Sequence, residues 1–414
     1  MLHSLNTEQK YAFDTITTAV QAGTPKVFIL DAPAGRGKTY LINCLQNVFK
    51  SSEIRLLAPT NKACSLLGEG AVTIHSFFGS KSSYSEEGNQ HFKLYGPNQK
   101  TLKSVKLVVV DEASMVSVEM LEIFTKLEKV LLFVCDRSQL PPINEKVSPI
   151  FLLERSSVEY ISLTENMRSS GAISTARDIV DEVREKGYTV PVLASLDEVI
   201  EDFKNKKDVV VLAYTNKRVA HWNDVIRRGV FGVTDPKKLE KAYVGECFFF
   251  TGERGVGDQK RVYNTSDVIR AVKVEKIRMN VVVNAPSVED TEGVETAEVC
   301  FYRIIDEDNQ YWLIPLREID TKVMKNIIKG RRDYCSKKRN KSCWAEFYEF
   351  VNTYSPALVS TYCTTVHKAQ GSEFLVVYVD YANMMSAKED TRRQLLYTAV
   401  SRMREEVKFI GSGV

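Results

Sequence analysis

The chain has 414 residues, of which 44% are hydrophobic and 26% charged, and its formal net charge is +3. This composition excludes a disordered, fibrous or membrane protein, and the length exceeds the roughly 250–300 residues at which one hydrophobic core stops growing, so we expect two or more folded units. The near-neutral charge excludes a uniformly basic nucleic-acid-binding protein, so any such site must be a local stripe.

The cysteines and the apolar runs indicate the cellular compartment in which the protein acts. The first residues are polar, and no apolar run approaches the ~20 residues that span a bilayer, so no targeting or membrane segment is expected. Eight cysteines contain no Cys-x-x-Cys pair, and the closest two are Cys335 and Cys343, away from any histidine cluster. We therefore expect reduced thiols, no zinc site and an intracellular setting, either cytoplasmic or in a host cell or nucleus.

Short apolar runs alternate with amphipathic stretches, which is typical of a parallel sheet with crossover helices. Continuous Val/Ile/Leu runs indicate strands that are buried on both faces. Because α/β sheets bind ligands at the carboxyl ends of their strands, polar residues just after these runs are candidate site residues. The runs span 26–30, 54–58, 105–110, 130–134, 158–163, 209–213, 375–379 and 407–410.

A phosphate-binding loop follows the first run. Residues 32–39 read Ala-Pro-Ala-Gly-Arg-Gly-Lys-Thr, and apolar residues then recur at helical spacing to Phe49. Strand, glycine-rich turn and helix form the context that a P-loop requires, although Ala32 stands where the first glycine is usual. Backbone N–H groups of such a loop hold phosphates, Lys38 reaches the outer phosphates, and the Thr39 hydroxyl binds Mg²⁺.

Between residues 79 and 103 the chain turns polar, and Gly88-Asn89 and Gly96-Pro97 suggest turns around Tyr84 and the run 91–95. We expect a β-hairpin inserted into the first α/β lobe. After it, Asp111 and Glu112 follow a buried apolar run. Asp111 can hold the water shell of Mg²⁺, and Glu112 can orient and deprotonate an attacking water.

A second break, roughly 239–351, contains β-rich segments at 244–250, 268–274, 280–283, 298–304 and 311–316, which predicts a small barrel. It closes with a basic stretch from Lys322 to Lys341, which carries nine Lys/Arg against one Asp. This stretch is either a solvated loop or a surface that guides a nucleic-acid strand. The aromatic residues Trp344 and Phe347 that follow are expected to pack rather than to stack on bases.

Four further segments resemble the motifs of superfamily 1 helicases, in the family's order and spanning nearly the whole chain. The sequences of these motifs, the hairpin-sized first insertion and the β-rich second insertion resemble those of the 1B branch. This branch comprises the Dda-type phage helicases with RecD-like and Pif-type relatives. The resembling segments are Asp136-Arg137-Ser138-Gln139-Leu140-Pro141-Pro142 for motif III, 163–168 for motif IV, 364–373 for motif V and 394–402 for motif VI.

The resemblance implies an α/β fold of two RecA-like P-loop NTPase lobes. The first lobe spans 1–78 and 104–157, and the second spans 158–238 and 352–414. The β-hairpin at 79–103 is then a wedge insertion, and 239–351 an SH3-like β-barrel insertion. The resemblance further implies an ATP-dependent DNA helicase that translocates 5′→3′ on single-stranded DNA and unwinds duplex DNA in replication, recombination or repair.

The resemblance also implies roles for individual residues. Gln9 matches an adenine-reading glutamine, Gln139 a γ-phosphate sensor, and Arg168 and Arg402 the two arginines that reach the γ-phosphate. Met403 departs from the family, which usually has a small residue there. The full implied nucleotide site, with ATP and Mg²⁺, comprises Gln9, Ala34, Gly35, Arg36, Gly37, Lys38, Thr39, Tyr40, Asp111, Glu112, Gln139, Arg168, Glu373 and Arg402, with Thr39 and Asp111 holding the metal.

For the nucleic acid, small polar side chains on both lobes match strand-gripping positions, and one hairpin aromatic, Phe92, is the expected wedge. Implied partners are single-stranded DNA and duplex junctions, with a single-strand-binding protein or other replication proteins, and the chain is expected to act as a monomer away from membranes. Two alternatives stay open: a viral-type RNA helicase, and a strand-binding module without productive unwinding. The implied contacts are Thr60, Asn61, His75, Ser76, Asn216, Thr365, His367 and Lys368, and the wedge candidates are Tyr84, His91 and Phe92.

Overall fold

The structure is a computed structural model, and two compact units make it up. An α/β unit comprises Met1–Gly79, Leu94–Phe231 and Tyr362–Val414, and an antiparallel unit comprises Ser80–Lys93 and Gly232–Thr361. The structure describes residues 5–84, 90–94, 96, 102–142, 145–165, 172–186, 188, 192–206, 208–250, 254–256, 261–263, 267–283, 295–338, 341–354 and 358–411.

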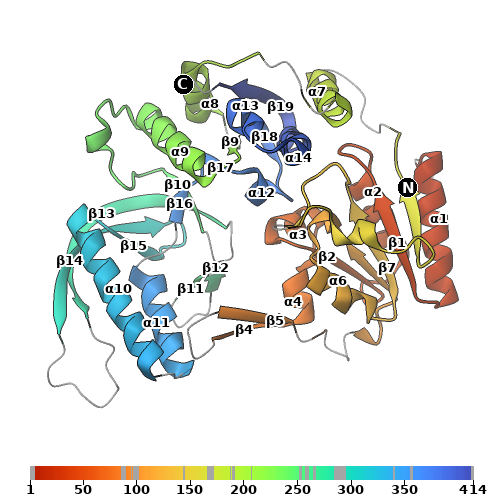
Figure 1. Ribbon diagram of the computed structural model, residues 1–414, viewed down its shortest axis with the longest axis horizontal. Helices are drawn as coiled ribbons and strands as arrows, with labels where there is room; N and C mark the ends of the chain where they lie inside the picture. The colour runs from red at the N-terminus through yellow and green to blue at the C-terminus, as the bar shows by residue number, and fades with distance from the viewer. Residues whose placement is uncertain are drawn as a thin grey trace. The chain divides into compact units, whose positions relative to one another are not determined.

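The first lobe of the α/β unit is a six-stranded parallel sheet with strand order β3-β2-β6-β7-β1-β8 (Figure 1). Its strands are β1 (Lys26–Asp31), β2 (Ile54–Ala58), β3 (Val72–Thr73), β6 (Leu107–Val110), β7 (Val130–Cys135) and β8 (Val158–Ser162). Its helices are α1 (Thr7–Ala22), α2 (Lys38–Val48), α3 (Asn61–Leu67), α4 (Ile74–Phe78) and α6 (Val118–Thr125), with the short η2 (Ala113–Met115) and η3 (Pro149–Leu152).

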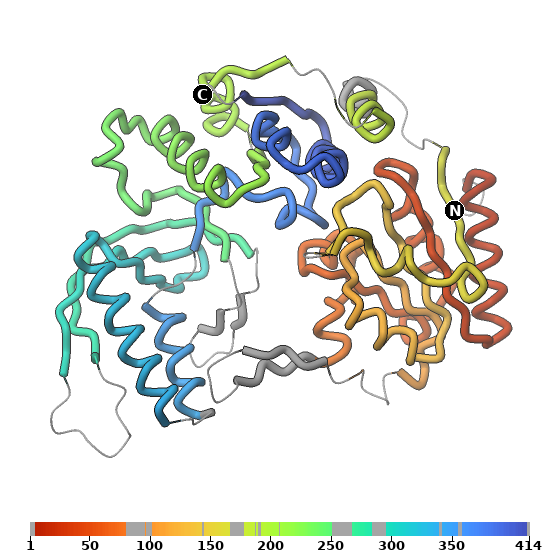
Figure 2. The backbone as a smooth tube through the Cα atoms, in the orientation of Figure 1, coloured from red at the N-terminus to blue at the C-terminus, as the bar shows by residue number. Residues whose placement is uncertain are grey.

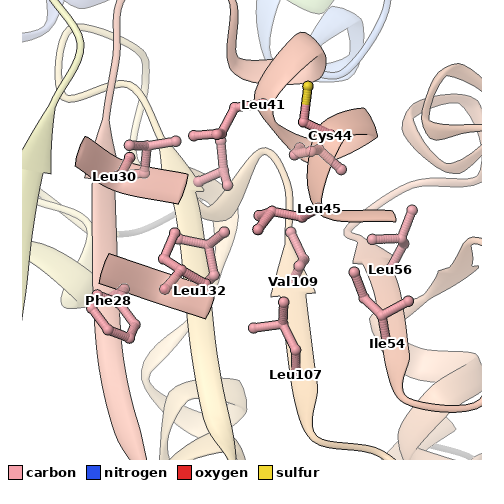
Figure 3. Packing of buried hydrophobic residues seen from close by; sticks show 14 of the residues in the cluster. Phe28, Leu30, Leu41, Cys44, Leu45, Ile54, Leu56, Leu107, Val109 and Leu132 are labelled. Carbon is pink, nitrogen blue, oxygen red and sulfur yellow. The ribbon is translucent and has the colours of Figure 1, made fainter. Parts of the chain in front are cut away.

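Both faces of this sheet are buried, which explains the uninterrupted apolar runs. Phe28 and Leu30 face the core shown in Figure 3, whereas Ile29 between them faces a second core on the other side. Successive side chains of a strand point to opposite faces, so every residue of such a run needs to be apolar. Each of these buried side chains contributes about 1.5–3 kcal/mol relative to an exposed one.

The second lobe is a four-stranded parallel sheet with strand order β17-β9-β18-β19. Figure 2 shows the chain leaving this sheet after α9 and returning to it near the C-terminus, drawn in blue. Its strands are β9 (Val209–Ala213), β17 (Cys363–Thr365), β18 (Phe374–Asp380) and β19 (Met403–Ile410), and its helices are α7 (Ala172–Lys186), α8 (Leu196–Asn205), α9 (Asn216–Phe231), α12 (Val366–Ala369), α13 (Tyr381–Met385) and α14 (Glu389–Val400).

The expected boundary between the lobes, at residue 158, is wrong. Strand β8 pairs in parallel with β1, from Val27 opposite Val158 to Asp31 opposite Ser162, and therefore belongs to the first sheet. An apolar run specifies a strand but not which sheet it joins, because the partner lies far away in the sequence. The second lobe therefore begins after β8.

The antiparallel unit has a five-stranded sheet with order β15-β14-β13-β10-β16, and two separate two-stranded sheets, β4-β5 and β11-β12. The strands are β4 (Ser80–Tyr84), β5 (Gln90–Leu94), β10 (Cys247–Phe250), β11 (Arg254–Val256), β12 (Arg261–Tyr263), β13 (Val268–Val282), β14 (Thr296–Asp306), β15 (Tyr311–Pro315) and β16 (Leu358–Ser360), and the helices are α10 (Glu318–Lys338), α11 (Lys341–Tyr354) and the short η4 (Pro236–Lys238).

One long strand replaces two that the sequence predicts. Residues 268–274 and 280–283 fall within β13, which runs for 15 residues and carries a register shift between Ala271 and Lys273. Such a shift bends a strand and lets it serve two cores. All five strands of the sheet contribute side chains to one small apolar core around Phe250 and Trp312, as in a rolled sheet.

The basic stretch is not a loop, because its middle forms helix α10. Met324, Ile327 and Cys335 recur at helical spacing and are buried, so charged positions between them obscured a clear amphipathic pattern. The expectation of reduced thiols throughout is also wrong, since Cys335 and Cys343 form a disulfide, their Cα atoms 5.5 Å apart. Trp344 and Phe347 pack beside it, as predicted.

No helix in the described part of the chain has the length and apolarity needed to cross a membrane.

Candidate nucleotide site

The glycine-rich turn joins β1 to α2 as the sequence predicts. Gly35 and Gly37 adopt φ of 79° and 83°, a left-handed conformation that side-chain-bearing residues rarely adopt. Lys38 is the first residue of α2, and its Nζ donates to the carbonyl oxygens of Ala32 (2.7 Å) and Pro33 (3.3 Å). The ammonium group therefore lies back over the loop that phosphates would occupy.

A cavity of about 330 Å³ lies over this loop within the α/β unit. It brings together most of the nucleotide-site residues that the resemblance implies. Met403, the departure from the family pattern, is buried and lines it as well. The implied site residues in its wall are Ala34, Gly35, Gly37, Lys38, Thr39, Asp111, Glu112, Gln139, Glu373 and Arg402.

Two neighbouring carboxylates at the end of β6 create an excess of negative charge in this cavity. Burial and, to a lesser degree, the adjacent Glu112 carboxylate raise the pKa of Asp111 to about 6, with Lys38 and Arg402 offsetting part of the rise. Glu112 has φ of 49°, which turns it away from the strand direction. A buried oxygen-donor pair beside the Thr39 hydroxyl fits Mg²⁺, a hard cation that prefers oxygen ligands.

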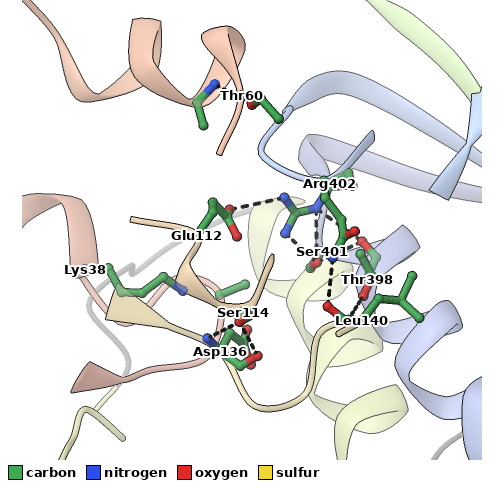
Figure 4. A network of polar contacts seen from close by, with 12 residues as sticks. Lys38, Thr60, Glu112, Ser114, Asp136, Leu140, Thr398, Ser401 and Arg402 are labelled. Carbon is green, nitrogen blue, oxygen red and sulfur yellow. Dashed lines mark hydrogen bonds and ion pairs between the residues drawn. The ribbon is translucent and has the colours of Figure 1, made fainter. Parts of the chain in front are cut away.

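Glu112, Gln139 and Arg402 form a triangle of polar contacts. Arg402 Nη1 lies 3.5 Å from Glu112 Oε1, and Figure 4 shows the two side chains pointing toward each other. In the amide orientation that satisfies both of its groups, Gln139 donates to Glu112 Oε2 (3.1 Å) and accepts from Arg402 Nη2 (3.2 Å). Arg402 is only 4% exposed, which separates it from an ordinary surface ion-pair former.

Tyr397 connects the second lobe to two loops of the first. Its hydroxyl donates to Asp136 Oδ2 (2.7 Å) and accepts the backbone N–H of Ala34 in the P-loop (3.1 Å). Tyr397 is fully buried, and burial also raises the pKa of Asp136. The sequence analysis missed this residue, because its partner Asp136 lies 261 positions away.

The loop that carries Gln139 is held from the second lobe at a further point. Thr398 Oγ1 accepts the backbone N–H of Leu140 (3.0 Å), and Gln370 Nε2 donates to the Leu140 carbonyl (2.9 Å). Leu140 immediately follows Gln139, so both its backbone groups are fixed by motif V and motif VI side chains. Any movement of the second lobe therefore acts directly on the position of Gln139.

The P-loop arginine and Gln9 have partners that the sequence did not reveal. Arg36 is 7% exposed, and its Nη2 lies 3.0 Å from Asp181 on α7. Gln9 is fully buried and does not line the cavity. It accepts from the Asn6 backbone (3.3 Å) and donates to the Gly37 carbonyl (3.5 Å), so it braces α1 against the P-loop.

The remaining two residues of the implied nucleotide site are Tyr40 and Arg168. Tyr40 lies in the first turn of α2 and is half-buried. Arg168 lies outside the described residues. The segment before Arg168 is held by Glu8, whose carboxylate accepts the backbone N–H groups of Thr164 (2.6 Å) and Glu165 (3.1 Å), a contact that the sequence analysis also missed.

The candidate nucleic-acid residues follow the ends of neighbouring strands in each sheet. Thr60 and Asn61 come after β2, and His75 and Ser76 after its neighbour β3. In the second lobe, Asn216 follows β9, and Thr365, His367 and Lys368 follow or end its neighbour β17.

Several of these side chains already have structural contacts. The hydroxyls of Thr60 and Thr365 accept backbone N–H groups at the starts of α3 and α12, which leaves each hydroxyl hydrogen free to donate. Burial lowers the pKa of His367. Among the wedge candidates, Tyr84 ends β4 and His91 and Phe92 lie on β5, but their side chains lie outside the described part of the structure.

Comparison with known proteins agrees with this architecture. The family profile described as an AAA domain matches residues 4–198, and that of the UvrD-like helicase C-terminal domain matches 360–410. The ATP-dependent DNA helicase dda of Enterobacteria phage T4 is 24% identical over 97% of this chain and 98% of its own. An uncharacterized protein of Acanthamoeba polyphaga mimivirus is 22% identical over 98% and 99%.

Solved structures show the same fold. Pif1 helicase from Bacteroides, in complex with ADP-AlF3 and ssDNA, matches with a TM-score of 0.51 at 15% identity, over 97% of this chain and 92% of that one. Pif1 helicase from Candida albicans matches with a TM-score of 0.50 at 17% identity, over 98% and 94%.

Two parallel sheets with a P-loop, a buried Asp-Glu pair and an arginine facing one cavity define a two-lobed P-loop NTPase. Within that class, the chain combines an AAA domain with a UvrD-like helicase C-terminal domain, and it is similar along almost its whole length to the Dda helicase.

Proposed function

We propose that this protein is an ATP-dependent DNA helicase that translocates 5′→3′ along single-stranded DNA and unwinds duplex DNA ahead of it. The proposal depends on one observation: the first-lobe residues Lys38, Glu112 and Gln139 line the same cavity as Arg402 of the second lobe. The strand polarity rests on the resemblance to the 1B group. An intracellular, monomeric protein acting in replication, recombination or repair is part of the same proposal.

The charged residues and the threonine hydroxyl at the cavity each have a proposed chemical role in ATP hydrolysis. Lys38 leaves the Ala32 and Pro33 carbonyls and binds the outer phosphates, and Glu112 orients and deprotonates the attacking water. Arg402, and Arg168 by resemblance, neutralise charge that develops on the transferred phosphoryl group. Thr39 and Asp111 would hold Mg²⁺, which when bound would supply Lewis-acid stabilisation of the phosphate oxygens.

Hydrolysis is coupled to strand movement through Gln139 and Tyr397. Gln139 contacts groups from both lobes, and Tyr397 of the second lobe contacts two loops of the first, so a change at the γ-phosphate position alters how the second lobe is held. The polar sets after β2 and β3 and after β9 and β17 grip the strand backbone without reading its sequence. Alternation of these two grips during closure and opening ratchets the protein along the strand.

The proposed function is tested by unwinding of one duplex that bears either a 5′ or a 3′ single-stranded tail, made of DNA or of matched RNA. Unwinding of only the 5′-tailed DNA is expected. Preference for the 3′ tail contradicts the polarity, and preference for the RNA tail contradicts the substrate, since the 2′-hydroxyl distinguishes the two. ATP turnover without any unwinding contradicts the helicase activity itself.

Phe92→Ala tests the wedge. The proposal assigns stacking on the junction base pair to this aromatic residue of a polar hairpin, so we expect unwinding to fall about tenfold, as loss of about 1–3 kcal/mol of stacking predicts. Strand-stimulated ATP hydrolysis is expected to stay unchanged. Tyr84→Ala and His91→Ala serve as controls, and a parallel loss of both activities in Phe92→Ala contradicts the assignment.

Tyr397→Phe tests the connection between the lobes. The variant keeps the buried ring and removes the hydroxyl, leaving Asp136 and the Ala34 N–H without this partner, which costs about 1–3 kcal/mol. We expect kcat for DNA-stimulated hydrolysis to fall about tenfold while KM for ATP changes little, measured by steady-state kinetics.

Tyr378→Phe is the matched control, because the Tyr378 hydroxyl also donates to a carboxylate, Asp202 Oδ2, at 2.7 Å but away from the nucleotide cavity. Both variants should lose similar thermal stability. Equal losses of kcat in the two variants contradict a positioning role for Tyr397.

A further inference from the structure

Helix α10 presents a row of cations on one exposed face. Lys325, Lys329 and Arg332 are exposed and follow one another at spacings of four and three residues, which places them on the same side of a helix. With a rise of about 1.5 Å per residue, the three span roughly 10 Å along the helix axis. Residues with this spacing present their charges to one partner at once.

These three side chains form no ion pair with any residue that the structure describes. Three other cations of the same unit are paired: Lys273 with Glu275 (2.7 Å), Lys276 with Glu240 (2.8 Å) and Arg278 with Glu298 (3.4 Å). Surfaces normally intersperse charges of both signs, whereas Asp333 is the one acidic residue of α10 from Lys322 onward. An exposed face with this excess of cations indicates an anionic partner.

The row is carried on a firmly held element. The opposite face of α10 buries Met324, Ile327 and Arg331, and Arg331 donates to the Val282 carbonyl (2.7 Å) and lies 3.8 Å from the Phe350 ring centre. Cations on a rigid scaffold lose less freedom on binding than cations on a loop.

Gly330 follows Lys329 on the exposed side of α10 and has no local structural reason to be glycine. A Cβ placed there would meet no atom within 4 Å, and its φ is not in the left-handed region. Glycine weakens a helix interior relative to alanine, so its presence needs another explanation. With Asn326 one turn before it, Gly330 leaves the helix backbone open to the close approach of a partner.

The chemistry of this face selects one kind of nucleic acid. Lysine, arginine and asparagine side chains are the usual contacts of phosphate and sugar oxygens. Single-strand sites interleave such residues with aromatic side chains that stack on bases, whereas no exposed position of α10 from Lys322 onward carries an aromatic residue. A duplex keeps its bases stacked on one another, so contact with its phosphate backbone needs no aromatic side chain.

We propose that the exposed face of α10, formed by Lys325, Asn326, Lys329, Gly330 and Arg332, binds the phosphate backbone of double-stranded DNA. This inference rests on the proposed function for the identity of the nucleic acid. The duplex contact is distinct from the strand-gripping residues of the α/β unit. It holds the duplex without reading its sequence.

The test compares two triple variants of the full chain that remove the same charge from the same unit. One is Lys325→Gln, Lys329→Gln and Arg332→Gln, and the control is Lys273→Gln, Lys276→Gln and Arg278→Gln, whose cations are ion-paired. Binding of blunt duplex DNA and of single-stranded DNA is measured by fluorescence anisotropy over a salt series. Each phosphate contact contributes about 0.9 to the salt slope for duplex DNA.

The α10 variant is expected to lower the duplex slope by about 2–3 and duplex affinity more than tenfold at low salt, with single-strand affinity unchanged. The control is expected to lower the duplex slope by less than 1. Equal effects in the two variants, or an effect of the α10 variant on single strands alone, overturn the proposal. Neither measurement needs unwinding, so a failure of the helicase activity is seen separately in the tailed-duplex assay.

Gly330→Ala provides a second measurement that does not change charge. The added methyl group should raise the melting temperature, because alanine favours the helix, yet weaken duplex binding severalfold at an unchanged salt slope. A more stable protein with undiminished duplex affinity contradicts the close approach. Circular dichroism and single-strand-stimulated ATP turnover show that each variant is folded.

Discussion

Lys38→Ala is expected to abolish ATP hydrolysis. The Lys38 ammonium is the cation of the P-loop itself, and it is held by two backbone carbonyls over the loop at the start of α2. Removing one preorganised charge from a phosphoryl-transfer site costs about 10²–10³ in rate, and the loss of phosphate binding adds to it. Phosphate release measured with saturating single-stranded DNA should therefore fall below about 1% of the parent rate.

The control for this variant is Lys26→Ala, which removes a lysine from the start of the same strand–loop segment. Lys26 pairs with Glu159 at the opposite end of β1, so its loss should leave turnover within about twofold. Appreciable hydrolysis by Lys38→Ala, with normal folding by circular dichroism, contradicts the assigned nucleotide site.

The nucleotide loop and the core strands could be predicted because their signals are local. A buried strand, two glycines and a helix lie within residues 26–48, and each Val/Ile/Leu run matches a strand buried on two faces. Short-range patterns of this kind do not depend on partners elsewhere in the chain. They therefore predicted that Lys38 would lie at the start of a helix and that Asp111 and Glu112 would follow a buried strand.

What could not be predicted depends on contacts between distant segments. The pairing of β8 with β1, and the hydrogen bond between Tyr397 and Asp136, join residues more than one hundred positions apart. Helix α10 was missed for a different reason, since its exposed face is so rich in charge that its buried stripe of Met324, Ile327 and Cys335 gave a weak pattern. The disulfide between Cys335 and Cys343 joins α10 to α11, two helices that the sequence analysis did not predict.

Arg402→Ala is expected to slow hydrolysis about 10³–10⁵-fold while ATP still binds, as for an arginine that stabilises the transferred phosphoryl group. This corresponds to about 4–7 kcal/mol of transition-state stabilisation. Arg402 is 4% exposed and lies 3.5 Å from Glu112, so its charge acts in a site largely shielded from water. Single-turnover hydrolysis and equilibrium binding of a fluorescent ATP analogue separate the two effects.

Arg402→Lys sharpens this test, because it keeps the charge and removes the planar fork. Arg402 contacts Glu112 through Nη1 and the Gln139 amide through Nη2, and one ammonium group does not reproduce both contacts. We expect Arg402→Lys to recover less than a tenth of the lost rate, which makes the geometry, rather than the charge alone, decisive for catalysis. Arg404 lies two residues after Arg402, is exposed and pairs with Asp208. The Arg404→Ala variant is therefore expected to hydrolyse ATP normally. Turnover in Arg402→Ala within tenfold of the parent contradicts a catalytic role, and it then makes the contact with Glu112 a structural link between the lobes.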